Sequence, residues 1–127
     1  MIVTYNCYFG SPLPLNLAGR FGERVEIEAL EFVNNIPIEW RLDESDWRPG
    51  LLSGVAESLR GFHDLQFPVH GGTRGYPAGN ATLHTRGIGD ALVLVWLRDG
   101  TYSERTIGSN PLQVLQPKTA NSKGSQG

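Results

Sequence analysis

The chain has 127 residues, of which 39% are hydrophobic and 19% are charged, with a formal net charge of −2. This length is sufficient for one domain with its own core, without support from disulfides or metals. The slight negative charge argues against a protein that binds nucleic acid by neutralising phosphates. The sequence also lacks the roughly 20-residue apolar run that a transmembrane helix requires. We therefore expect no nucleic-acid partner and no membrane insertion.

The chain has one cysteine, Cys7, so it can form no internal disulfide and no cysteine-based metal cluster. Its first residues show no basic segment followed by an apolar stretch, which predicts no secretory signal. A reducing, cytoplasmic location is the expectation that fits both observations. No cofactor and no metal are expected, because no spacing of residues matches a phosphate-binding loop or a metal-ligand motif.

In chain order, the first expected element is a strand at residues 2–9, which are rich in β-branched and aromatic side chains. Residues 23–33 fit two structures. Apolar side chains that alternate with Glu26 and Glu28 favour a half-exposed strand, with a bulge near residues 29–30 where the alternation changes phase. The glutamate, alanine and leucine content also suits a helix. We favour the strand.

Two asparagines at residues 34–35 tolerate positive φ and predict a two-residue hairpin turn. Residues 36–42 are then expected to return alongside the preceding strand. The spacing predicts a helix over residues 49–60, because Leu51, Val55 and Leu59 recur every four residues. A proline at its first position and a glycine just after its end are typical helix boundaries.

The clearest local pattern is at residues 91–97, which are all apolar and are followed by Asp99-Gly100. This pattern predicts a β-hairpin in which residues 101–107 form the returning strand. The first of these strands is apolar on both faces, so we expect it to be central in its sheet.

Shorter extended segments are expected at residues 65–69, 81–86 and 112–116. Together the elements predict an α+β fold, in which a curved, mainly antiparallel sheet of about five to seven strands packs on one central helix. We expect residues 1–116 to form a single domain and residues 117–127 to form a disordered tail.

The glycine-rich segment at residues 70–89 contains the candidate ligand-binding residues Arg74, Tyr76, Asn80 and Arg86. Glycines let backbone N–H groups approach an anion, and arginines add paired contacts to phosphate or carboxylate. The alternative interpretation is a surface loop that needs glycine for its turns.

Four candidates for acid–base catalysis lie in or near this segment: His63, Asp64, His70 and His84. Imidazole changes its charge near neutral pH, which suits proton transfer. The alternative is that these are ordinary surface or structural residues.

The candidate partner surface is the acidic stretch of residues 23–46 together with the tryptophan that follows it; its candidate residues are Glu26, Glu28, Trp40 and Trp47. Tryptophan is enriched at interface hot spots. The alternative is a solvated strand face with both tryptophans in the core.

The leading hypothesis for function is a small, non-catalytic binding or accessory protein that recognises a protein or a small molecule. It is motivated by the lack of a recognisable catalytic motif in the sequence. The alternative is a small enzyme or ligand-binding domain that uses the histidines and arginines of residues 70–89 on an anionic substrate. A homodimer that pairs through sheet edges is a third hypothesis.

Overall fold

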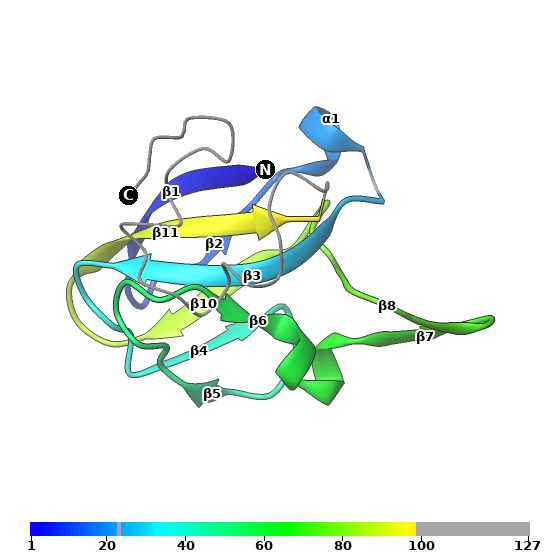
Figure 1. The fold of residues 1–127 in the computed structure, drawn as a ribbon. Helices are drawn as coiled ribbons and strands as arrows, with labels where there is room; N and C mark the ends of the chain where they lie inside the picture. The colour runs from blue at the N-terminus through cyan, green and yellow to red at the C-terminus, as the bar shows by residue number, and fades with distance from the viewer. Residues whose placement is uncertain (23, 99–127) are drawn as a thin grey trace, which may run out of the picture.

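The computed structural model describes residues 1–22 and 24–98, which form two larger antiparallel sheets and one two-stranded sheet, with little helix (Figure 1). The five-stranded sheet has the order β1 (Ile2–Tyr8), β11 (Asp90–Leu97), β3 (Glu26–Val33) and β6 (Glu57–Ser58), and β9 (Tyr76–Pro77) also pairs with β3. The four-stranded sheet has the order β2 (Leu13–Pro14), β10 (Thr82–Arg86), β4 (Glu39–Leu42) and β5 (Arg48–Pro49).

The remaining elements are short. Two strands, β7 (Phe67–Val69) and β8 (Gly72–Arg74), form a hairpin that extends away from the two sheets (Figure 1). The helical segments in the described residues are α1 (Ala18–Phe21) and the 3-10 turns η1 (Leu59–Gly61) and η2 (His63–Leu65). No helix in this part of the chain has the length and apolar character that a membrane crossing requires.

Strand β11 is central in its sheet, as its apolar pattern predicted. Val95 pairs with Val3 of β1 on one side and with Leu30 of β3 on the other. The predicted returning strand at residues 101–107 lies outside the described residues. Over the described residues, β11 pairs with β1 on one side and with β3 on the other.

The main core lies between the two sheets, because it contains side chains from strands of both. Val93 and Val95 of β11 join Phe32 of β3, Leu83 of β10 and Trp40 of β4 in one buried cluster. The alternate residues of β11 face the other way and join a second, smaller cluster; the members of that cluster are Ala29, Ala56, Leu94 and Trp96. Burial on both faces explains why residues 93–97 of β11 are all apolar.

Residues 26–33 form a strand, as we favoured, and an irregularity occurs next to the predicted position. Ala29 pairs with Trp96 and Ile27 with Leu97, so Glu28 is the extra residue of a bulge. The expectation of a half-exposed strand is wrong, because Glu28 has an exposed fraction of 6% and Glu31 of 0%. Strand β3 lies inside its sheet and is covered on both faces.

Asn34 has a φ of 92° but Asn35 has no positive φ, so only the first residue of the predicted two-residue turn has the expected conformation. The predicted hairpin across it is wrong. Strand β4 belongs to the other sheet, where it pairs with β10 and β5. The turn therefore transfers the chain from one layer of the fold to the other.

The helix predicted over residues 49–60 is wrong: this segment instead contains β5, β6 and the start of η1. Two glycines explain the difference. A Cβ on Gly50 would lie 1.8 Å from the carbonyl oxygen of Pro37, and Gly54 has a φ of 78°, outside the helical region. The segment crosses from one sheet to the other, and the spacing-four leucines Leu51 and Leu59 enter the inter-sheet core.

The described part of the chain is thus a small antiparallel β-protein with two larger sheets and a two-stranded sheet, rather than one sheet packed on a central helix. All its strand pairs are antiparallel, as expected. The predicted strand at residues 112–116 and the predicted tail at 117–127 lie outside the described residues.

Candidate functional site

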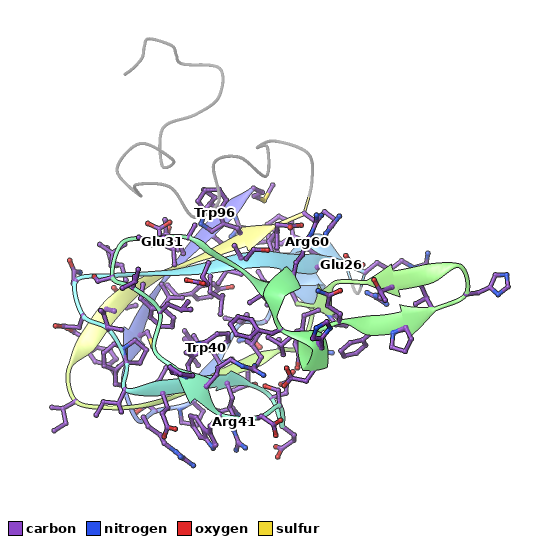
Figure 2. All side chains as sticks on the ribbon, turned by 60° about the horizontal axis from the view of Figure 1, so that its bottom comes forward. Glu26, Glu31, Trp40, Arg41, Arg60 and Trp96 are labelled. Atoms are coloured by element: carbon purple, nitrogen blue, oxygen red, sulfur yellow. The ribbon has the colours of Figure 1, made fainter. Side chains whose placement is uncertain are left out.

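The outer face of the four-stranded sheet carries an aromatic and cationic cluster. In β4 and β10, side chains alternate between the inter-sheet core and the outer face. Trp40 and Leu42 point inward and are fully buried. Glu39 and Arg41 alternate with them along β4 and therefore occupy the outer face. Figure 2 shows Trp40 between the sheets and Arg41 on the other side of β4.

Pairing between β4 and β10 brings the outward side chains together. His84 lies opposite Arg41, and Arg86 lies opposite Glu39. Directly opposed residues in an antiparallel pair are close enough to interact. The Arg86 guanidinium accordingly donates to Glu39 Oε1 over 2.9 Å.

Trp47 precedes β5 and contacts this group of side chains. The guanidinium carbons of Arg41 and Arg86 lie 4.7 Å and 3.8 Å from the centre of its ring. We call Glu39, Arg41, Trp47, His84 and Arg86 the Trp47 cluster. Each guanidinium is within the range of a cation–π interaction, which holds it in a defined orientation.

A pocket of about 300 Å³ adjoins the cluster, which is the lower end of the size of ligand sites. Its lining combines the turn after β1 with the cluster and comprises Gly10, Ser11, Pro12, Trp47, His84, Thr85 and Arg86. The pocket therefore offers an aromatic ring, a guanidinium and an imidazole to one ligand.

The charge of the Trp47 cluster is suited to an anion. Two guanidinium groups face a single carboxylate, that of Glu39, so the cluster carries a net positive charge even with His84 neutral. The Nε of Arg41 is buried and has no hydrogen-bond acceptor among the described residues. A carboxylate or phosphate oxygen is a strong acceptor for a guanidinium, and the exposed guanidinium of Arg86 lines the pocket.

A second pocket, also of about 300 Å³, contains two of the predicted ligand-binding residues, Tyr76 and Asn80. Its complete lining is Asp43, Phe67, Tyr76, Pro77, Gly79, Asn80 and Ala81. The Tyr76 hydroxyl donates to Asp43 Oδ2. Burial, followed by this contact with Asp43, raises the pKa of Tyr76 above its ordinary value.

The two predicted ligand-binding arginines lie in different places. Arg86 belongs to the Trp47 cluster. Arg74 on β8 has its Nε 3.4 Å from Glu26 Oε2. The four predicted ligand-binding residues therefore do not form one site: Tyr76 and Asn80 share one pocket, Arg86 lines the other, and Arg74 pairs with Glu26.

The carboxylates predicted to form an acidic partner surface are paired within the chain. Glu28 contacts Arg60 at 3.1 Å and Arg98 at 2.8 Å. Glu26 contacts Arg74 and Arg98 and accepts a hydrogen bond from the backbone of Gly75. Figure 2 shows Glu26 and Arg60 on the same side of the molecule, away from Arg41.

The four catalytic candidates are spread over the fold. His63 and Asp64 lie exposed in η2, His70 lies exposed between β7 and β8, and His84 lies in the Trp47 cluster. Asp64 forms an ion pair with Arg48. Among the described residues, no group of three or more histidine, cysteine, aspartate or glutamate side chains could hold a metal ion.

The two tryptophans predicted for the partner surface have different environments. Trp40 is fully buried and packs edge-on against Phe62 at a centroid distance of 5.7 Å. Trp47 is half-buried at the pocket. Trp47 therefore has an accessible surface, whereas Trp40 is a core residue.

Two further titratable groups are buried, Cys7 and Glu31. Burial raises the pKa of the Cys7 thiol, and a hydrogen bond with Thr85 opposes this shift. Burial also raises the pKa of Glu31, which accepts a hydrogen bond from the Trp96 indole at 3.2 Å. Glu31 and Trp96 lie near each other in Figure 2.

Sequence reasoning missed Glu39, Arg41 and Asp43. The alternation of polar and apolar residues at 39–42 was a usable signal, because it places Glu39 and Arg41 on one face. Asp43 has a φ of 50°, which aspartate tolerates better than most residues.

Comparison with known proteins gave no matching family, no matching curated relative and no matching solved structure.

Proposed function

We propose that this protein is a non-catalytic binding protein whose partner, a protein or a small molecule, presents a carboxylate or phosphate group to the Trp47 cluster. One observation carries the proposal: two guanidinium groups lie over one half-buried tryptophan at the edge of a pocket. A single guanidinium beside a carboxylate is common on protein surfaces. Two guanidinium groups that stack on the same ring are already oriented toward one ligand-sized region.

The three kinds of group in this pocket have complementary roles. Arg86, which lines the pocket, supplies charged donors to the anionic group, and Arg41, which stacks on the same Trp47 ring, adds positive charge nearby. The Trp47 ring supplies a flat apolar surface for the adjoining part of the ligand. Because stacking fixes both guanidinium groups before the ligand arrives, less side-chain entropy is lost on binding.

A cationic surface fits the structure better than the acidic surface expected from the sequence. The carboxylates of Glu26 and Glu28 already contact three arginines. A basic partner would have to displace these contacts. We further propose a cytoplasmic location, which a single free and buried cysteine supports.

The test is a thermal-shift screen with inorganic phosphate, nucleotides and small carboxylates, followed by titration of each compound that raises the melting temperature. A ligand that binds only the folded state must raise that temperature. Substitution of Arg86 with alanine is expected to weaken binding of the anion about tenfold or more, because it removes a charge-assisted contact.

Arg20→Ala is the matched control, because Arg20 also stacks on a surface aromatic ring, that of Phe21, at 4.8 Å. This variant is expected to bind the anion like the wild type. Equal losses of affinity in both variants, or no stabilisation of the wild type by any of these anions, would refute the proposal.

The alternative function, a small enzyme acting on an anionic substrate, is favoured by one observation: His84 lines the same pocket as Arg86. Imidazole could then transfer a proton to a substrate held by the arginine. The experiment is to incubate each anion identified in the screen with the protein and follow it by NMR. Conversion that is lost in a His84→Gln variant would support the enzyme and contradict a purely binding role.

A further inference from the structure

The pocket around Asp43 is chemically the opposite of the Trp47 cluster. Both pockets lie along β10, since Ala81 immediately precedes this strand and Arg86 ends it. One presents a guanidinium group, and the other presents a carboxylate together with two aromatic side chains. We propose that the Asp43 pocket is a second binding site, and that it takes an alkylammonium group.

The Asp43 carboxylate is held in place by two neutral donors. Its Oδ1 accepts from the backbone N–H of Thr82 at 2.9 Å, and its Oδ2 accepts from the hydroxyl of Tyr76. Each carboxylate oxygen has two acceptor positions. Asp43 therefore keeps acceptor capacity and its full negative charge for a ligand in the pocket.

The aromatic side chains of this pocket favour a cation with an apolar part. Phe67 and Tyr76 pack edge to face, with ring centres 5.5 Å apart at 81°. Phe67 has an exposed fraction of 38%, so part of its surface is available to a ligand. Aromatic rings attract ammonium groups and also pack against the attached alkyl chain.

The nearest other charges do not neutralise Asp43. Arg48 forms an ion pair with Asp64 and stacks on Phe62 at 4.9 Å, so its positive charge is compensated by Asp64. Arg48 and Asp64 nearly cancel, and the carboxylate of Asp43 leaves a net negative charge beside the pocket. The backbone of Asp43 lies in the left-handed region, an uncommon conformation that is over-represented at ligand sites.

The experiment is a titration of the full chain with n-butylammonium chloride, followed by backbone amide NMR. Sodium chloride controls for ionic strength, and 1-butanol controls for the alkyl chain without the charge. Saturable shifts are expected at the amides of Tyr76, Gly79 and Ala81, with n-butylammonium only. Equal saturable binding of 1-butanol, or no saturable shift with n-butylammonium, would overturn the proposal.

Asp43→Asn is the main variant, because asparagine also tolerates a positive φ and can exchange hydrogen bonds with both Thr82 and Tyr76. We expect its affinity for n-butylammonium to fall about tenfold or more, because the charge-assisted contact is lost. The control is Glu44→Gln, which removes the same charge from the exposed neighbouring residue and is expected to leave binding unchanged.

Phe67→Leu is the second variant, and it tests the site without altering Asp43. Its expected loss of affinity is about two- to fivefold, since an aromatic ring near a cation contributes modestly at an exposed site. Unchanged affinity in both Asp43→Asn and Phe67→Leu would overturn the site. A thermal melt of each variant checks that it is folded. If Asp43→Asn does not fold, the affinity of Phe67→Leu for n-butylammonium decides the outcome.

Discussion

Trp40 and Trp47 lie close in sequence, and both have an arginine over the ring, yet they occupy opposite sides of the four-stranded sheet. Arg48 lies 5.2 Å from the ring centre of Trp40 in the interior. Arg41 and Arg86 lie over Trp47 on the outer face. The difference follows from strand alternation, which sends Trp40 inward and leaves Trp47 beside a pocket.

The comparison shows that an arginine stacked on a tryptophan can be part of the core packing or part of a candidate binding site. Arg48 has an exposed side-chain fraction of only 7%, and its charge is balanced by Asp64, so its stacking is part of the packing. Arg86 has an exposed fraction of 54%, and its charge remains accessible to a ligand. Exposure of the arginine therefore distinguishes a structural pair from a candidate binding pair.

The largest expected effect is on the stability of the interior pair. Trp40→Ala is expected to lower the free energy of unfolding by about 3–5 kcal/mol, because it leaves a large cavity in the core. Trp47→Ala is expected to lower it by about 1 kcal/mol, the scale of exposed cation–π contacts. Urea denaturation measures both. Equal losses would show that Trp47 is a core residue and would remove the contrast.

A smaller effect is expected from the arginines. Arg48→Ala is expected to cost about 2 kcal/mol, between the values typical of surface and buried ion pairs. Arg41→Ala, on the outer face, is expected to cost about 1 kcal/mol or less. The same denaturation experiment applies. A larger loss in Arg41→Ala than in Arg48→Ala would contradict the division of roles.

The smallest effect on stability is expected for Glu39→Gln, since its pair with Arg86 is exposed and worth about 0.5 kcal/mol or less. The same substitution is expected to raise the affinity for an anion, although it lowers stability. Glu39 competes with an anionic ligand for Arg86, so the variant is expected to bind an anion about two- to fivefold more tightly. Isothermal titration calorimetry measures this. Weaker binding would indicate that Glu39 itself contacts the ligand.

Strands whose side-chain pattern is local were predictable from the sequence. The β-branched residues of β1 and the apolar run of β11 identified both strands, and apolar side chains on both faces identified β11 as central. Periodicity alone could not exclude the helix that was wrongly predicted at residues 49–60. Its apolar spacing is helical, but Gly50 packs against Pro37 from another part of the chain, and this contact cannot be derived from local pattern.

The candidate site was predictable only in its parts. Trp47, His84 and Arg86 were singled out from the sequence, but in two separate hypotheses: Trp47 for a partner surface, and His84 and Arg86 for an anion site. They come together because β4 pairs with β10, strands that lie about 40 residues apart in the chain. Alternation at residues 39–42 could have placed Glu39 and Arg41 on one face, but pairing at that separation depends on the whole fold, so the combined site could not be identified beforehand.

The position of β1 beside β11 has a consequence for how the protein assembles. Strand β1 ends at Tyr8 and pairs with a strand that begins at Asp90. Most of the described chain therefore lies between the two strands. Pairings between such distant segments slow folding. We expect the contact between β1 and β11 to be among the last to form, after the pairings between strands that lie closer together in the chain.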